Sequence, residues 1–393
     1  MTRTVILDGA RTPFGKLGGN ISLLSASQLG GVVIREALTR SKVDPGEVGE
    51  VIMGNVLQAG QGQIPSRQAA REAGIPWEVK SETINKVCAS GMRSVVLADL
   101  LIRSGEEEIV VAGGLESMSN TPYAVSSTRF GARMGNTQMI DLLIHDGLSC
   151  SFTGVHMGTY GNKTANEFNL SREEQDKWAV RSHFLAIKAK KSGALSDEIV
   201  PVSVPQRKGE PILIEHDEGP REDTTVEVLS KLRPAFEKDG TITAGNAPGV
   251  NDGAAALVLM NEERALNENK DVLATIIAHA EIAVEASRFP ETPGLVINKL
   301  LDKTNKTIDD IDLFEMNEAF AAVALASAKI ANIPSEKINV NGGAIALGHP
   351  IGASGTRIIL TLAYELKRRG GGIGIASICS GSGQGDAIMI EVN

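Results

Sequence analysis

The sequence predicts an α/β fold made of two similar halves, with an insertion that interrupts the first half. Strand-like and helix-like patterns alternate over residues 1–119 and again after residue 270. Glycine is abundant at 42 residues while aromatic residues make up only 4% of the chain, a profile typical of enzymes in which glycine-rich turns join strands to helices. Several short motifs also recur, in the same order, about 263 residues further along the chain.

The first half begins with a regular alternation of elements. Apolar runs and their flanking turn residues predict strands at 5–8, 48–56, 83–87 and 108–113 and helices at 25–41, 68–73 and 92–101. Ser25 and Gln28 have the spacing of a capping box, which supports the start of the first helix. Because strands alternate with helices, we expect a mostly parallel sheet with helices on both faces.

Residues 120–245 differ in character, being rich in Ser, Thr, Gly, Met and charged residues. A capping box at Ser171 and Glu174 predicts a helix over 171–191, and residues 201–217 suggest a pair of edge strands. We interpret this region as an inserted loop domain that covers a site.

The remaining elements predict a second half. They are a helix running into a strand at 254–260, strands at 272–280 and 312–316, and helices at 293–301 and 319–331. The expected domains are therefore residues 1–119 plus 246–270, the insertion 120–245, and residues 271–393.

The repeated motifs support two related halves. Residues 31–38, 47–53 and 90–93 return as 294–301, 310–316 and 354–357, at offsets of 263, 263 and 264. This duplication makes the loop 341–352 the counterpart of the loop that carries Cys88. Equivalent loops of two pseudo-symmetric halves can meet at one cleft, so we expect His349 to face Cys88.

Composition and charge argue against several functional classes. The net charge of −9, without a dense Lys/Arg run, predicts neither nucleic acid nor a membrane as a partner. No run approaches 18 apolar residues, and no signal or transit segment is recognised, so a cytoplasmic location is expected. Cys88, Cys150 and Cys379 lack metal-binding spacing and are too few for a disulfide framework.

Four residues on turns or at the ends of predicted strands are candidates for catalysis: Cys88, Asn317, His349 and Cys379. A thiol at a strand-to-helix turn lies near the positive end of a helix dipole, which favours the thiolate. A histidine beside it would complete a nucleophile, a second cysteine could act as acid and base, and nearby glycines leave N–H groups free for an oxyanion. The alternative for Cys88 is a small buried hydrophobic residue.

The motifs around these residues resemble the thiolase family, and within it the short-chain, biosynthetic acetyl-CoA acetyltransferase branch. The matching blocks include Asn85-x-x-Cys88-x-Ser90-Gly91, Asn317-Glu318-Ala319-Phe320 and Gly348-His349-Pro350, together with residues 10–15, 113–119, 231–236, 244–247, 251–255 and 341–352. The resemblance therefore spans the chain. It implies a five-layer αβαβα core of duplicated α/β halves, and a homotetramer, a dimer of dimers, that docks through residues 126–143.

The resemblance also implies a reaction, the reversible condensation of two acetyl-CoA to acetoacetyl-CoA and coenzyme A, as in fatty acid metabolism. Coenzyme A thioesters are then substrates, and neither a cofactor nor a metal is expected. Cys88 would carry the acyl group, His349 would activate it, and Cys379 would move the α-proton. Asn317 would position a water in one oxyanion hole. The N–H groups of Cys88 and Gly381 would form the second oxyanion hole.

Further residues are assigned to substrate binding by the same resemblance. They are His156, Met157, Arg221, Ala247 and Phe320; core packing is the alternative for His156 and Met157, and a solvated charge for Arg221. Two positions depart from the family pattern. Pro248 stands where a coenzyme A-binding serine is common, and Ser382 replaces a glycine in the Cys379 loop.

Three other functions compete with this interpretation. A degradative 3-ketoacyl-CoA thiolase would accept longer chains, although Met157 after His156 and the lack of a transit segment favour the short-chain enzyme. A Cys–His–Asn hydrolase would leave Cys379 without a role, and a non-catalytic acyl-CoA binder would be expected to lose Cys88 or His349. Two reactive cysteines in one cleft also raise the prospect of a Cys88–Cys379 disulfide under oxidation.

Overall fold

The computed structural model describes residues 3–393, in which ten strands form one continuous sheet. The strand order is β12-β13-β14-β11-β1-β10-β5-β3-β4, and the short β2 pairs with β10. The strands are β1 (Thr4–Arg11), β2 (Gly15–Lys16), β3 (Glu50–Gly54), β4 (Lys80–Ile84), β5 (Ile109–Ser117), β10 (Asn251–Asn261), β11 (Ala274–Ala283), β12 (Leu313–Met316), β13 (Gly372–Ser380) and β14 (Gln384–Val392). The two parts of the sheet join at a short antiparallel contact between β1 and β11.

The expectation of a mostly parallel sheet is wrong. Within the ten-stranded sheet of residues 3–393, only β3 with β4, β3 with β5, and β12 with β13 run parallel, whereas β1, β10, β11 and β14 pair antiparallel with their neighbours. Each parallel pair is joined by a connection that contains a helix, because two parallel neighbours can be joined only by a crossover from one end of the sheet to the other. The chain then returns after the insertion as β10, and after the tight turn 381–383 as β14, each of which reverses direction.

The prediction of a helix at the start of 254–260 is also wrong, because this segment lies wholly within β10. Its alanines favour a helix by propensity, but the strand lies between β1 and β5 and is buried on both faces. The sequence of a strand buried on both faces is a continuous apolar run and does not alternate between apolar and polar residues. The other predicted strands and helices are confirmed, with boundaries that shift by a few residues.

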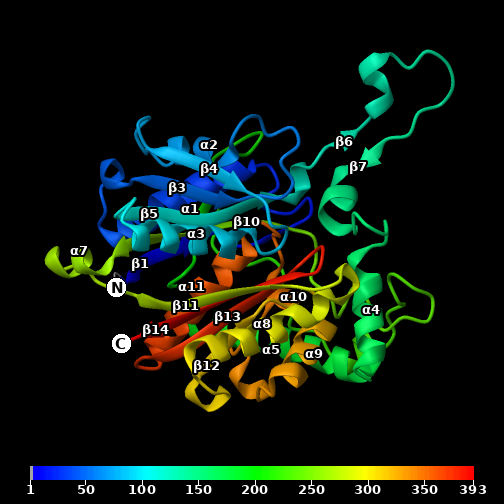
Figure 1. Ribbon diagram of the computed structural model, residues 1–393. Helices are drawn as coiled ribbons and strands as arrows, with labels where there is room; N and C mark the ends of the chain where they lie inside the picture. The colour runs from blue at the N-terminus through cyan, green and yellow to red at the C-terminus, as the bar shows by residue number, and fades with distance from the viewer. Residues whose placement is uncertain (1–2) are drawn as a thin grey trace.

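Helices cover each part of the sheet on both faces (Figure 1). One core joins β1, β3, β5 and β10 to α1 (Ala26–Ser41) and α2 (Pro65–Glu72). A second core lies around α3 (Ser90–Ser104) and α11 (Ser354–Arg368), which pack between the two parts of the sheet. A third core joins β11–β14 to α8 (Thr292–Thr304) and α9 (Ala321–Ala331).

Strand periodicity explains how one sheet serves these cores. Successive side chains of a strand point to opposite faces. Val5 accordingly belongs to the outer core with α1, while Ile6 belongs to the central core with α3 and α11. Ile388 and Met389 of β14 divide in the same way between the central core and the core with α8.

The repeated sequence motifs occupy matching elements. Residues 31–38 and 294–301 lie in α1 and α8, and residues 47–53 and 310–316 lead into β3 and β12. The recurring Ser-Gly pairs begin α3 and α11, which have 15 residues each.

The region between β5 and β10 contains more helix than the sequence predicts. α5 (Arg172–Ser192) and the pair β8 (Val202–Val204) and β9 (Ile212–Ile214) are confirmed, and α4 (Met157–Glu167) is an additional helix. Short helices elsewhere are α6 (Val226–Leu229), α7 (Glu262–Asn267) and α10 (Ala344–Leu347). An arm that carries β6 (Tyr123–Ala124) and β7 (Ile140–Asp141) projects away from the body of the protein (Figure 1).

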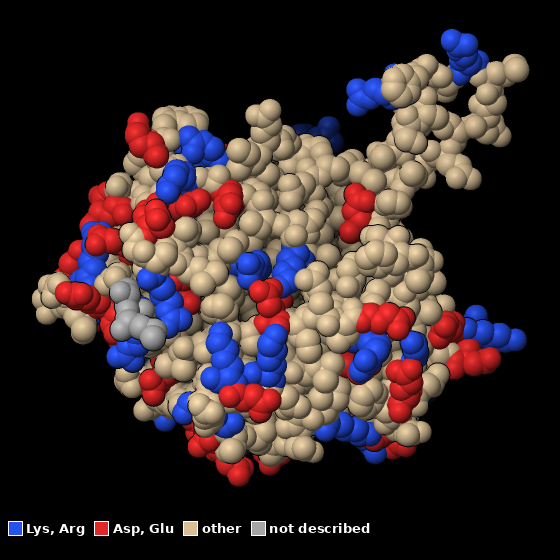
Figure 2. All heavy atoms as spheres, viewed as in Figure 1, with Lys and Arg blue, Asp and Glu red and all other residues tan. Residues whose placement is uncertain are grey.

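A buried ion-pair network ties this region to the sheet. The Arg11 guanidinium at the end of β1 lies 2.6 Å from Glu198 and 2.6 Å from Asp217, both in the region between β5 and β10. Arg11 is fully buried, so its charge must be compensated within the protein. Basic and acidic side chains are mixed on the outer face in view (Figure 2). None of the helices described in residues 3–393 is long and apolar enough to cross a membrane.

Helices α3 and α11 meet at their N-termini through two glycines. A Cβ atom added at Gly355 would lie 2.3 Å from the backbone nitrogen of Met92, and one added at Gly91 would lie 2.8 Å from the carbonyl oxygen of Gly352. Neither contact can be relieved by rotating a side chain. The close approach of the two helices therefore requires glycine at both positions.

We predict that Gly355→Ala destabilises the protein by about 1–3 kcal/mol, because the added methyl group overpacks the contact between α3 and α11. Urea-induced unfolding measures the change. Gly46→Ala is the matched control, since Gly46 is exposed and its nearest neighbour is a side-chain oxygen of Asp44, at 3.1 Å, rather than backbone. Equal effects of the two substitutions would contradict the prediction.

Candidate active site

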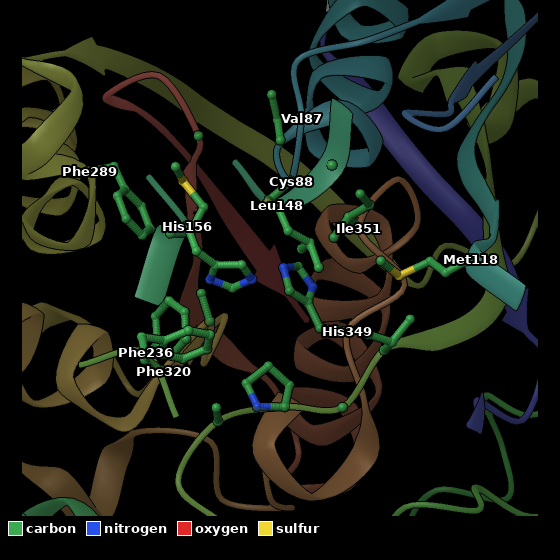
Figure 3. A pocket seen from close by; sticks show the side chains of 18 residues that line it. Val87, Cys88, Met118, Leu148, His156, Phe236, Phe289, Phe320, His349 and Ile351 are labelled. Atoms are coloured by element: carbon green, nitrogen blue, oxygen red, sulfur yellow. The ribbon is translucent and has the colours of Figure 1, made fainter. Parts of the chain in front are cut away.

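One cavity of about 180 Å³ brings together most of the residues that the sequence singled out. It lies where the Cys88 turn, the His349 loop and the turn after β13 meet α4 (Figure 3). Of the predicted site residues, those that line it are Cys88, His156, Met157, Ala247, Phe320, His349 and Gly381. Asn317 and Cys379 are fully buried, and Arg221 does not line the cavity.

Cys88 sits on a strained turn between β4 and α3. The preceding residue, Val87, adopts a left-handed backbone conformation with φ of +47°, which is costly for a β-branched side chain. The sequence suggested an extended conformation there. Hydrogen bonds hold the turn in place: the Val87 N–H donates to the Asn85 side chain (2.9 Å), and the Ser90 hydroxyl donates to the Val87 carbonyl (2.6 Å). The turn thereby presents the thiol to the cavity.

The thiol of Cys88 is neutral in the resting protein, contrary to the expectation of a thiolate. Burial raises its pKa to about 11, although the Gly381 N–H donates to the sulfur and opposes this shift. Desolvation disfavours the charged form more than a helix N-terminus favours it. A base must therefore remove the proton as Cys88 reacts.

His349 can supply that base. Burial, with the nearby Arg357 cation as a second cause, lowers the pKa of His349 to about 3, so the imidazole is neutral at pH 7. Its Nδ1 lies 2.6 Å from the Ser354 hydroxyl, which donates to the Pro350 carbonyl (2.9 Å). Nδ1 then carries the hydrogen and Nε2 is free to accept a proton. Ser354 was not predicted as a site residue, although its Ser-Gly motif was recognised.

Asn317 and Cys379 lie behind the cavity wall. The Asn317 side-chain nitrogen is 3.4 Å from His349 Nε2, and its buried Oδ1 has no hydrogen-bond partner among the described residues. Cys379 is the penultimate residue of β13 and pairs with Gly385 of β14. Burial, together with the nearby Cys88 sulfur, raises the pKa of Cys379 well above its ordinary value. Both cysteines are therefore thiols at neutral pH, and among the described residues neither is in a disulfide.

Aromatic stacking forms the other side of the cavity. His156 caps α4, with Nδ1 accepting from the Gly158 N–H, and its ring stacks on Phe236 at a centroid distance of 4.3 Å. Phe236 in turn meets Phe320 edge-on at 6.1 Å. The imidazoles of His156 and His349 point toward each other across the cavity (Figure 3).

Several lining residues were not predicted. They are Val87, Met118, Gly147, Leu148, Phe236, Pro248, Gly249, Val250, Phe289, Ala319 and Ile351. Phe236 ended a motif that was recognised, and that block was the available signal for it. Leu148, Phe289 and Ile351 carry no local sequence signal, because an apolar wall residue looks the same as a core residue.

Two buried carboxylates hold the loops of the site. Glu116 accepts hydrogen bonds from the N–H groups of Val56 (3.0 Å), Leu57 (3.1 Å) and Gly352 (2.9 Å), and burial raises its pKa to about 7. Glu318 accepts from Trp178, Ser182, Asn339 and the Ile345 N–H. Glu116 therefore fixes the loop after His349, and Glu318 joins α5 to the segment before it.

Three further positions concern the expected substrate-binding residues and the two departures from the family pattern. Arg221 lies in a separate groove along α5, with Phe184 and Lys188. Pro248 lines the cavity but has neither a hydroxyl nor an N–H to donate. Ser382 adopts a left-handed conformation with φ of +67°, which glycine would adopt without strain. Within residues 3–393, no three His, Cys, Asp or Glu side chains are grouped so as to hold a metal ion.

Comparisons with known proteins agree on one family. The model of the thiolase N-terminal domain matches residues 4–263, and that of the thiolase C-terminal domain matches residues 270–392. Proteins named probable acetyl-CoA acyltransferase from Staphylococcus aureus (strain COL) and Staphylococcus epidermidis are each 47% identical over 391 residues, covering 100% of this chain and 99% of theirs. The crystal structure of the Bacillus anthracis acetyl-CoA acetyltransferase superimposes with a TM-score of 0.98 at 42% identity, covering 100% of this chain and 99% of that one.

The pKa of Cys88 predicts how its alkylation depends on pH. Because the thiol titrates near pH 11, its thiolate fraction should increase about tenfold per pH unit between pH 7 and 9.5. The rate of carbamidomethylation of Cys88 by iodoacetamide, followed by peptide mass spectrometry, should rise in parallel. Cys150, whose pKa is lowered, serves as an internal reference. A plateau for Cys88 below pH 8 would show that it rests as a thiolate.

Proposed function

The chain belongs to the thiolase family, and we propose that it acts as an acetyl-CoA acetyltransferase that joins two acetyl-CoA into acetoacetyl-CoA and coenzyme A, reversibly. The observation that carries this proposal is a single cavity with a thiol, a neutral imidazole and a glycine N–H at its wall, backed by a second buried thiol. The cavity volume of about 180 Å³ suits a short acyl group better than a long chain.

In the first half-reaction, the Cys88 sulfur attacks the thioester carbon of acetyl-CoA. The thiol proton moves to His349 Nε2, which is unprotonated at pH 7. As the bond to coenzyme A breaks, the leaving sulfur takes a proton from Cys379. The products are acetyl-Cys88, protonated His349, a Cys379 thiolate and free coenzyme A.

In the second half-reaction, the Cys379 thiolate removes an α-proton from a second acetyl-CoA. The high pKa of Cys379 makes its thiolate a strong base, which a weakly acidic α-carbon requires. The enolate carbon attacks acetyl-Cys88 and expels its sulfur, which recovers the proton held by His349. Acetoacetyl-CoA leaves, and all three groups return to their resting states.

Two oxyanion sites would stabilise these steps. We assign one to the N–H groups of Cys88 and Gly381, and the Gly381 N–H already donates to the Cys88 sulfur. We assign the other to His349 Nε2 and a water held by Asn317. The buried, unpartnered Oδ1 of Asn317 supports that role, because such an atom needs a polar partner.

Substrate binding follows from the same cavity. We propose that His156, Met157, Ala247 and Phe320 contact the acyl and pantetheine portions, since all four line it. Coenzyme A is longer than the cavity, so its nucleotide end must lie outside. Arg221, in the groove along α5, is our candidate for a cation at that end.

We further propose that the chain is built as a five-layer αβαβα core of duplicated halves, with domains 1–119 plus 246–270, 120–245 and 271–393. The helix packing and the matched motifs support this division. We also propose a cytoplasmic location, in keeping with thiols at Cys88, Cys150 and Cys379.

The division of labour between the cysteines gives a direct test. Wild-type protein should gain one acetyl group on Cys88 from acetyl-CoA, and Cys88→Ala should gain none. Cys379→Ala should still be acetylated, because His349 can return its proton to the leaving group. It should not exchange the α-protons of acetyl-CoA with deuterated solvent, and condensation should fall about 10²–10⁴-fold.

Mass spectrometry measures acetylation, and NMR measures the exchange. Cys150→Ala is the matched control and should retain both activities, since Cys150 does not line the cavity. His349→Ala should impair both steps. Acetylation on Cys379, or condensation by Cys379→Ala at the wild-type rate, would overturn the assignment of roles.

We propose that the chain assembles as a homotetramer, a dimer of dimers, and that the projecting arm docks the dimers. The arm exposes Phe130 (92%) and Met134 (98%), two large apolar side chains on a segment that projects from the body of the protein. Phe130→Glu with Met134→Glu should yield dimers in analytical ultracentrifugation. Phe184→Glu, an exposed residue of α5, is the control and should leave the tetramer intact; an unchanged tetramer in the arm variant would refute the docking role.

A further inference from the structure

We propose that Lys86 is a positioning residue that sets the spacing between Cys88 and Cys379 by clamping the Cys88 turn to β13 and β14. This inference rests on the proposed division of labour between the two cysteines. Lys86 lies two residues before Cys88 and was not singled out by any sequence motif. Its side chain contacts β14 and β11, and its backbone carbonyl contacts β13, the strand that carries Cys379.

The side chain of Lys86 bridges two acidic residues on the other half of the sheet. Its ammonium group lies 2.7 Å from Asp386 on β14 and 2.6 Å from Glu281 on β11. Asp386 is nearly inaccessible, with 2% of its side chain exposed, and Lys86 retains only 13%. An ion pair in such a place holds a defined geometry, because water competes for it only weakly.

The strand register places these contacts directly beside the second cysteine. Asp386 pairs with Ile378, the residue before Cys379. The hydroxyl of Ser380, the residue after Cys379, donates to the Lys86 carbonyl at 2.5 Å. The side chain and carbonyl of Lys86 therefore hold the chain on either side of Cys379.

The same residue is fixed within the Cys88 turn. The Lys86 N–H donates to the Ser90 hydroxyl at 2.8 Å, and the Lys86 carbonyl accepts from the Ala89 N–H at 3.1 Å. Movement of Lys86 would therefore move the strained turn as a unit. The clamp links the proposed nucleophile to the proposed base across the junction of the two halves.

Lys86 belongs to a row of charged and polar side chains along this junction, in which burial lowers the pKa of His279 and keeps its imidazole neutral at pH 7. Arg93 lies 3.4 Å from Glu281, and further along α3 Asp99 lies 3.6 Å from His279 of β11. Basic and acidic side chains gather on the face where α3 and β11 lie next to each other (Figures 1 and 2). Of these pairs, only the Lys86 contacts reach residues adjacent to the two cysteines.

A displaced clamp should affect the two half-reactions unequally. Acetylation of Cys88 requires the turn, His349 and the Gly381 N–H. Proton transfer and carbon–carbon bond formation additionally require Cys379 at the correct distance from acetyl-Cys88. Misplacement by about 1 Å can reduce a rate 10²-fold. Lys86→Met should therefore lower α-proton exchange and condensation about 10–100-fold while acetylation of Cys88 changes only a few-fold.

The experiment measures acetylation rate, α-proton exchange, condensation and KM for acetyl-CoA in five proteins. They are the wild type, Lys86→Met, Lys86→Arg, Arg93→Gln, and Lys86→Met combined with Asp386→Asn. Lys86→Arg retains a cation that can bridge both carboxylates and should restore most of the lost exchange. Arg93→Gln removes a neighbouring cation from Glu281 without touching either cysteine segment, and should behave as wild type.

The double variant guards against misfolding. Lys86→Met alone leaves Asp386 buried without a cation, whereas the pair removes both charges. The double variant should show the same selective loss of exchange. Equal losses of acetylation and exchange, or no loss of either, would overturn the positioning role. Failure of the wild type to acetylate Cys88 would instead refute the proposed function, so the two failures are distinguishable.

Discussion

The close contact between α3 and α11 is the constraint on which the site depends. Gly91 and Gly355 let the N-termini of two central helices approach until backbone meets backbone. One helix begins just after Cys88, and the other begins just after the His349 loop. The same contact therefore packs the centre of the fold and brings the Cys88 turn and the His349 loop to one cavity. A larger residue at either glycine would separate the two helices, and with them Cys88 and His349.

Burial controls the chemistry of the site more than local electrostatics does. The two thiols and His349 are all held in their neutral forms, because the apolar cavity disfavours every charged state. Because all three groups start neutral, one proton can be transferred among them each time a thioester bond forms or breaks. In the proposed reaction, the His349 imidazole and the two cysteines pass protons in turn, and each group returns to its starting state at the end of the cycle.

Buried charged residues around the site hold neighbouring segments in place. Arg11 secures the region between β5 and β10 to the end of β1, Glu116 braces the loop after His349, and Lys86 joins the two cysteine segments. Each is buried, or nearly so, and is matched by hydrogen bonds or opposite charges. Such groups contribute little net stability, but their directional contacts specify one arrangement of loops. Loops that must hold reacting atoms within a fraction of an ångström benefit from that specificity.

The sequence by itself determined the α/β class, the duplicated motifs and most of the elements, because periodicity and capping are local properties. It also singled out Cys88, His349, Asn317 and Cys379 as candidates for catalysis, since each lies in a distinctive glycine-rich or small-residue context. Tertiary structure alone decided the antiparallel placement of β10 and the neutral state of Cys88, because each depends on what surrounds a residue from distant segments. Phe236, Glu116 and Lys86 acquire their roles in the same way, through partners that are distant in the sequence.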